Sequence, residues 1–219
     1  MTRITFINPN STRAMTDSVV AVARAALPDA TITGMTNTDG PPAIQGAADG
    51  AAAVPGLLAR IPEARATGAE AIVIACFDDT GLAEAQAMAG CPVLGIGQAS
   101  YLMAALLGLR FSVVTSTYPS IPVIESNIRE QGFAGACASV RAANLPVLEI
   151  DEGLEPARAR IAEEIALARD EDRAQAVVLG CAGMSALAPD LAARTGIRLI
   201  DGVAAAAYLA RAAVGFSAA

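Results

Sequence analysis

The chain has 219 residues, of which 54% are hydrophobic and 17% charged, so it carries enough apolar side chain for a folded protein with a substantial core. All 15 of its basic residues are arginine, and the sequence contains no lysine, histidine or tryptophan. These absences exclude a Schiff base on lysine, Ser-His or Cys-His catalysis, and a metal site built on histidine. We therefore expect neither a pyridoxal phosphate Schiff base nor an ordinary zinc or iron site, and proton transfer falls to carboxylates, tyrosines or thiols.

The net charge of −7 and the isoelectric point near 4.6 argue against nucleic-acid and membrane-surface partners, because an acidic surface repels phosphate groups. The N-terminal residues do not resemble a signal segment, and the most apolar stretch, residues 203–219, is too short and too interrupted to span a bilayer. Four cysteines without a CxxC pair are not typical of a disulfide scaffold. We expect a cytoplasmic protein with a small-molecule substrate, and the high apolar content favours a homo-oligomer.

Short apolar runs rich in valine and isoleucine alternate along the chain with longer stretches of helical character. The runs show little polar alternation, which is typical of strands buried on both faces. The sequence predicts strands at residues 4–8, 30–34, 71–75, 93–96, 111–115, 139–142, 176–180 and 198–200, of which the second and sixth have the weaker signals. It predicts helices at residues 13–26, 47–66, 82–89, 100–107, 121–131, 154–169, 186–194 and 203–213. This order indicates an α/β fold with parallel sheets.

The chain also repeats itself. The segment that begins at Ala69 aligns without a gap on the segment that begins at Ala174, and Cys76 then falls on Cys181. Alanine-rich α/β units can resemble one another by composition alone, but an ungapped match that pairs two cysteines favours a duplication. It predicts two pseudo-symmetric, Rossmann-like parallel-sheet half-domains with an active site in the cleft between them. The expected half-domains comprise residues 1–98 together with 203–219, and residues 99–202.

Cys76 and Cys181 each follow a predicted strand and precede a predicted helix. Ligands of parallel α/β sheets bind at such strand ends, where helix N-termini present free amides. The positive end of the helix dipole is expected to lower the pKa of each thiol below about 8.5, which would make it a proton base near neutral pH. The alternative is that each cysteine is a small buried hydrophobe. Two cysteines at equivalent positions favour a catalytic role.

Two aspartates, Asp78 and Asp79, come directly after the first of these cysteines. Either carboxylate could orient N–H groups of a ligand or take part in a proton relay, or it could cap the free amides of a helix. Capping is favoured for at least one of them. A carboxylate that faced Cys76 would raise the pKa of the thiol, so we do not expect both aspartates to face the sulfur.

Polar loops follow the opening strand of each half. Residues 8–12 (Asn-Pro-Asn-Ser-Thr) and residues 115–117 (Thr-Ser-Thr) could cradle a carbonyl or carboxylate group, and they could equally form a turn and a helix N-cap. The Gly-Ile-Gly sequence at residues 95–97 lacks the third glycine and the acidic partner of a dinucleotide-binding motif, so we do not interpret it as one.

At these residues the chain resembles the Asp/Glu racemase superfamily, and most closely its hydantoin and allantoin racemase branch. The blocks that carry the resemblance, in the order of that branch, are INPNST (7–12), ACFDDTGL (75–82), VVTS (113–116), CASVRA (137–142) and LGCAGM (179–184). The resemblance implies two pseudo-symmetric α/β half-domains, no metal, no pyridoxal phosphate, and proton transfer by Cys76 and Cys181. It also implies substrate binding by Asn8, Ser11, Asp79, Gly81, Thr115, Ser116 and Gly183, the glycines and Asp79 through backbone amides.

The sequence departs from the superfamily at two points. Racemases of free aspartate or glutamate in this superfamily begin with an acidic Asp-Ser-Gly-type loop, whereas this chain has Asn8 and Asn10, which argues against a free amino acid as substrate. Hydantoin racemases often have a proline where this chain has Thr80, which leaves the substrate open. Our hypothesis is a cofactor-independent racemase of 5-substituted hydantoins or allantoin. Alternatives are an arylmalonate-type decarboxylase, a maleate-type cis-trans isomerase, and a binding protein without catalysis.

Overall fold

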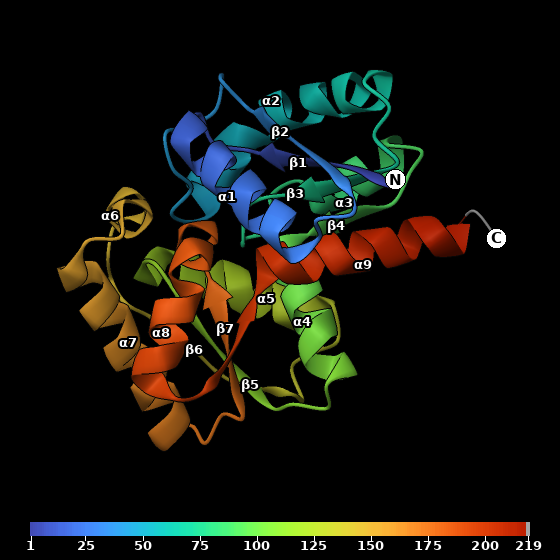
Figure 1. Ribbon diagram of the computed structural model, residues 1–219. Coiled ribbons are helices and arrows are strands. Elements are labelled where there is room, and N and C mark those ends of the chain that lie inside the picture. The colour runs from blue at the N-terminus through green and yellow to red at the C-terminus, as the bar shows by residue number, and fades with distance from the viewer. Residues whose placement is uncertain (218–219) are drawn as a thin grey trace.

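The structure, a computed structural model, describes residues 1–217 and contains two parallel four-stranded sheets (Figure 1). The strand orders are β2-β1-β3-β4 and β6-β5-β7-β8, so the two sheets have the same topology. The first sheet consists of β1 (Arg3–Asn8), β2 (Thr31–Thr36), β3 (Ala71–Ile74) and β4 (Val93–Gly95). The second consists of β5 (Phe111–Thr115), β6 (Cys137–Ala142), β7 (Ala176–Gly180) and β8 (Arg198–Asp201). The predicted α/β class and all eight predicted strands, including the two weaker ones, are confirmed.

Helices connect the strands and cover both faces of each sheet. They are α1 (Arg13–Ala26), α2 (Ala47–Ala66), α3 (Leu82–Met88), α4 (Ile96–Leu106), α5 (Ile121–Glu130), α6 (Val147–Glu152), α7 (Glu155–Asp170), α8 (Ala188–Thr195) and α9 (Gly202–Ser217). The predicted helix at 100–107 instead begins at residue 96, and the one at 186–194 is preceded by a 3-10 helix over residues 182–187. The short α6 was not predicted. Six residues are too few to give a clear apolar period.

A shared core joins the two halves. Tyr101 of α4 is fully buried and stacks on Phe111 of β5 with 5.8 Å between ring centroids, while it meets Phe77 edge-on at 5.9 Å. Such aromatic pairs contribute about 0.5–1.5 kcal/mol each beyond the area they bury. The last helix, α9, lies between the halves and packs against both α1 and α4 (Figure 1). The assignment of residues 203–219 to the first half-domain, and the boundary at residue 98, stay predictions, and residues 218–219 lie outside the described part.

The outer face of the first sheet is covered by α2. Its residues Ala53, Leu57 and Ile61 recur every four positions, so they form one apolar stripe, and all three are buried. Leu57 and Ile61 of this stripe belong to one buried cluster with Ile7 of β1 and with Ile72 and Ile74 of β3. Full burial of one such aliphatic side chain stabilises the fold by roughly 1.5–3 kcal/mol. The packing fixes β3, and therefore the residues that follow it.

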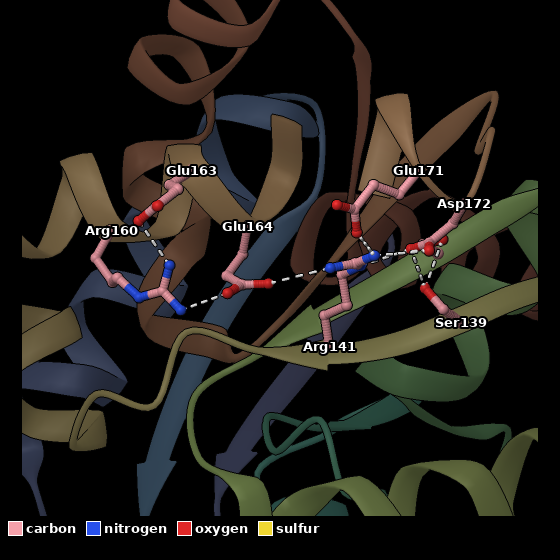
Figure 2. Close-up of polar contacts among 8 residues, drawn as sticks. Ser139, Arg141, Arg160, Glu163, Glu164, Glu171 and Asp172 are labelled. Carbon is pink, nitrogen blue, oxygen red and sulfur yellow. Dashed lines mark hydrogen bonds and ion pairs between the residues drawn. The ribbon is translucent and has the colours of Figure 1, made fainter. Parts of the chain in front are cut away.

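An ionic network holds the edge strand β6 on α7 (Figure 2). The Arg141 guanidinium donates to the carboxylates of Asp172 (Nε–Oδ2 2.6 Å) and Glu171 (Nη2–Oε2 2.7 Å), and Glu164 lies 3.7 Å away. Ser139 donates to the same Asp172 carboxylate at 2.5 Å. The hydrogen bond that Arg141 donates to Asp172 holds the pKa of the Asp172 carboxyl below its usual range. The CASVRA block, which is the edge strand β6, therefore has a structural role in this fold.

Candidate active site

Both candidate cysteines line one cleft between the two sheets. In the parallel registers, Ile7 pairs with Ile74 and Thr115 pairs with Gly180, so the ends of the four central strands lie at the edges that face this cleft. Cys76 follows β3 and Cys181 follows β7, which are equivalent strands of the two sheets. The structure therefore brings the two thiols to one site.

Local turns fix the two thiols at the ends of their strands. After β3, the backbone N–H of Asp79 donates to the Cys76 carbonyl at 3.1 Å. After β7, the N–H of Met184 donates to the Cys181 carbonyl at 3.0 Å, and Cys181 caps the 3-10 helix that follows. Each cysteine thus stands at the first residue of a tight turn, where its side chain leaves the sheet toward the cleft.

Burial raises the pKa of both thiols. The pKa of Cys181 is raised to about 12, and the pKa of Cys76 is also raised, because desolvation disfavours the thiolate in each. The charge of Asp78 raises the pKa of Cys76 further, and a charge on Cys181 adds to it, as expected for two sulfurs in one cleft. The expectation that helix N-termini lower these pKa values is therefore wrong, since the loss of water outweighs the dipole.

Hydrogen-bond donors offset part of this cost. The Thr80 hydroxyl lies 3.5 Å from the Cys76 sulfur and favours its thiolate. The backbone N–H groups of Gly183 and Met184 face the Cys181 sulfur and favour its thiolate. Such donors are worth more to a charge in a buried site than in water. Gly183, predicted to bind substrate, thus lies beside a thiol, although it is not among the residues that line the cleft.

The two adjacent aspartates have separate roles in the structure. Asp79 is buried, and its carboxylate accepts hydrogen bonds from the backbone N–H groups of Gly97 (3.0 Å) and Gln98 (2.8 Å) and from the Gln131 side chain (3.1 Å). It therefore caps the N-terminus of α4 from a distant loop, which explains why α4 begins early. Asp78 instead lines the cleft that holds both thiols.

The glycines at residues 95 and 97 make room for this cap. A Cβ atom on Gly95 would lie 1.9 Å from Asp79 Oδ1, and one on Gly97 would lie 2.9 Å from Oδ2. Neither distance is compatible with a side chain. The Gly-Ile-Gly sequence is thus explained by a buried carboxylate, as its lack of a full dinucleotide motif already indicated.

The predicted polar cradle is divided between cleft and scaffold. Thr115 and Ser116 line the cleft, and so does Asn10. Asn8 lies outside it: its amide donates to Asn10 Oδ1, to the Thr12 carbonyl and to Thr16 Oγ1, at 2.9–3.1 Å. Asn8 thus holds the loop that presents Asn10.

Three further predicted substrate-binding residues do not line the cleft: Ser11, Asp79 and Gly81. The Ser11 N–H donates to the Pro41 carbonyl at 2.9 Å, and Gly81 adopts a left-handed turn with φ of 66°. Their roles in substrate binding stay predictions, and the geometry gives each a structural role in its turn.

Sequence reasoning missed two apolar residues of the cleft wall. Ile44, in the loop after β2, and Val147, at the start of α6, both line the cleft. The Val147 N–H donates to Gln45 Oε1 at 3.0 Å, so a loop of the first half is tied to the second half. Ile44 and Val147 lie 147 − 44 = 103 positions apart, one in a loop and the other at the start of a six-residue helix, so no local periodicity indicates them.

Two searches of residues 1–217 gave negative results. No helix in this range is long and apolar enough to cross a bilayer. In the same range no three Cys, Asp or Glu side chains gather into a group that could ligate a metal ion.

Comparisons with known proteins agree with this geometry. The family model described as Asp/Glu/Hydantoin racemase matches residues 4–210. A hydantoin racemase from Rhizobium meliloti is 45% identical over 213 residues, which cover 97% of this chain and 88% of that protein. The solved structure of an allantoin racemase from Klebsiella pneumoniae superposes with a TM-score of 0.94 at 37% identity, covering 99% of this chain and 89% of that one.

A second allantoin racemase structure, from Pseudomonas fluorescens, has a TM-score of 0.93 at 32% identity and covers 98% of this chain and 92% of that one. The fold, the order of the motif blocks and these relatives all agree with the resemblance seen in the sequence. The chain belongs to the Asp/Glu/hydantoin racemase family.

Proposed function

We propose that this protein is a cofactor-independent racemase of 5-substituted hydantoins or allantoin, in which Cys76 and Cys181 act on opposite faces of C5. The proposal rests on one observation: two thiols, each of which follows an equivalent strand of two equivalent sheets, line one cleft. Relatives named hydantoin racemase and allantoin racemase supply the substrate class.

The chemistry needs two proton carriers and a means to hold an oxyanion. The C5–H bond of these rings lies between a carbonyl carbon and a ring nitrogen. One thiolate takes the C5 proton, and the electron pair of the C–H bond moves onto the carbonyl oxygen to give a planar enolate. The opposite thiol then delivers its proton to the other face, the carbonyl re-forms, and that sulfur is left as the thiolate. The reverse reaction exchanges the two roles.

The raised pKa values fit a weak carbon acid. A buried thiolate with a raised pKa is a stronger base than an exposed one, which favours removal of a proton from carbon. The same burial keeps the proportion of thiolate low, so bound substrate and the donors at Thr80, Gly183 and Met184 must stabilise it. We infer that the thiolate forms in the closed complex, from which water is excluded.

Hydroxyl groups in the cleft are the candidates for polar contacts with the ring. Thr115, Ser116 and Ser120 all line the cleft and are buried. The Thr115 hydroxyl donates to the Gly180 carbonyl at 2.8 Å, so its own oxygen is free to accept. Ser116 and Ser120 are the candidate donors to the developing enolate oxygen, the type of contact that commonly contributes most to such catalysis.

The test is racemisation of a panel of chiral 5-substituted hydantoins and allantoin, followed by optical rotation. We expect the wild-type protein to racemise at least one of them, and Cys76→Ser or Cys181→Ser to lower the rate at least about a thousandfold. Cys91→Ser, which alters a thiol outside the cleft, is the matched control and should keep the wild-type rate. Full racemisation in either of the first two variants would contradict the two-thiol mechanism.

Other substrates, and a binding assay, separate the alternatives. Carbon dioxide released from a disubstituted malonate would favour a decarboxylase, and fumarate formed from maleate would favour a cis-trans isomerase. Ligand binding that survives the loss of both thiols, with no turnover by the wild type, would favour a binding protein. A cytoplasmic location and self-association stay predictions from composition.

A further inference from the structure

One carboxylate in the cleft has no partner. Asp78 Oδ2 is buried and accepts no hydrogen bond from any residue in the range 1–217. A buried polar atom without a partner costs about 1–3 kcal/mol, and more when it is charged, so it is rare outside functional sites. Its neighbour Asp79, by contrast, accepts three hydrogen bonds and is fully used by the fold.

We propose that the Asp78 carboxylate accepts a hydrogen bond from a ring N–H of the substrate and so orients the ring between the two thiols. This inference rests on the function proposed above, and it makes Asp78 a residue that selects uncharged cyclic amides. Hydantoin and allantoin rings carry N–H groups beside the carbonyl groups, and an N–H is the partner that the unpaired oxygen lacks.

Hydrogen bonds hold the backbone of Asp78 in place, so the conformation of the loop directs its side chain to the cleft. The Asn127 side chain, from α5 of the second half, donates to the Asp78 carbonyl at 2.8 Å. The Asp78 N–H faces the Cys76 sulfur. Both main-chain polar groups of the residue are thereby used, and only the carboxylate is left for a ligand.

The surroundings favour an N–H donor over an anion. Burial and the nearby charge of Asp49 raise the pKa of Asp78 to about 7, so a donor that stabilises the carboxylate relieves part of this cost. No arginine is among the described residues that line the cleft. A substrate carboxylate would therefore meet Asp78 without a compensating cation, which agrees with the lack of an acidic-amino-acid motif in the first loop.

The experiment is a thermodynamic cycle that combines a change in one side chain with a change in one substrate group. The measured quantity is binding affinity and not turnover. The probes are 5,5-dimethylhydantoin, which has no C5 proton to lose, and its N1-methyl and N3-methyl derivatives. Dissociation constants are measured by calorimetry for the wild type and for Asp78→Asn. For the parent ring we expect the variant to bind about ten- to a hundredfold more weakly, the usual worth of a hydrogen bond to a charged group.

For one of the two N-methyl derivatives, wild type and variant should bind with the same affinity, because the hydrogen bond is already absent. If Asp78→Asn weakens the binding of both N-methyl derivatives by the same factor as it weakens the binding of the parent ring, the proposal is overturned. A wild type that binds none of the three rings would also overturn it. Asp78→Ala repeats the cycle with no acceptor at all, and it replaces Asp78→Asn if that variant does not fold.

The matched control is Asp49→Asn. Asp49 lies near Asp78 but outside the cleft, so its loss changes the local charge without removing the acceptor. We expect it to alter the affinity for all three rings by the same factor. Coupling in the Asp78 cycle without racemisation of any hydantoin would leave this proposal standing and contradict the proposed function. Racemisation without coupling would do the reverse.

Discussion

The two thiols of the cleft occupy equivalent places in the two halves, yet their surroundings differ. Cys76 receives a hydroxyl donor from the Thr80 side chain and faces one backbone N–H, that of Asp78. Cys181 is more buried, with 7% of its surface exposed, and two backbone N–H groups face it. Burial raises the pKa of both thiols, and the charge of Asp78 adds to the rise in each. A shared fold position therefore fixes where a thiol lies, while the loop that follows decides which donors face it.

A contrast of the same kind holds for α4 and α9, the helices that follow the last strand of each sheet. In the second half, Asp201 immediately precedes α9 and accepts from the Val203 N–H at 3.0 Å, so the cap is local. In the first half, the cap of α4 comes from Asp79, in the loop after β3. That loop therefore contains two aspartates with different roles: Asp79 caps α4, and Asp78 lines the cleft.

The largest expected effect in the first half is on stability. The pKa of Asp78 is about 7 in the folded protein and near 3.8 when unfolded, so the folded state binds more protons between these values. Wild-type stability should then fall as pH rises through this window, and Asp78→Asn should avoid the loss. We expect the variant to match the wild type at pH 4 and to exceed it by up to about 4 kcal/mol at pH 8, measured by urea unfolding.

The groups that face Asp78 set the control for this measurement. The titratable groups that interact with Asp78 are Asp49, Cys76, Asp79, Tyr101 and Cys181, and of these Asp49 is the one whose charge raises the pKa of Asp78. Asp49→Asn should therefore give a smaller gain over the same pH window. A variant at Asp78 that is no more stable than the wild type at pH 8 would contradict the assignment of a costly, unpaired carboxylate.

A smaller effect is expected at the donor to Cys76. Thr80→Val removes the hydroxyl that lies 3.5 Å from the sulfur, so the pKa of Cys76 should rise further. We expect kcat/KM for racemisation to fall about tenfold, in line with the loss of one hydrogen bond to a charge, and Thr80→Ser to restore it. The loss should be equal for both enantiomers, because their equilibrium constant of one ties the two directions together. An unchanged kcat/KM would show that this hydroxyl does not act on the thiolate.

Periodicity and repeats were sufficient to predict the fold. Buried strands such as β3 and β7 are continuous apolar runs, and the 105-residue offset of their cysteines placed both at equivalent strand ends. What the sequence did not contain was the partner of each polar group. Asp78 and Asp79 are chemically identical neighbours, and only the tertiary position of α4 makes one a cap and leaves the other unpaired.

The direction of the thiol pKa shifts was not predictable either. The helix N-terminus beside each cysteine is visible in the sequence, but the depth of burial is not, and burial is the larger effect. In the first loop, Asn8 and Asn10 could both have faced a ligand. The hydrogen bonds of Asn8 to the loop itself leave Asn10 at the cleft.

The most direct test of two thiols on opposite faces of one carbon is the early fate of deuterium in heavy water. Each pure enantiomer of a 5-substituted hydantoin is incubated with the wild-type protein. Before equilibrium is reached, the two enantiomers are separated and the deuterium content of each is measured by mass spectrometry. With Cys76 on one face and Cys181 on the other, the product enantiomer should carry deuterium while the recovered starting enantiomer keeps its hydrogen. Deuterium that enters the recovered starting enantiomer as fast as product forms would mean a single base, and would contradict this account.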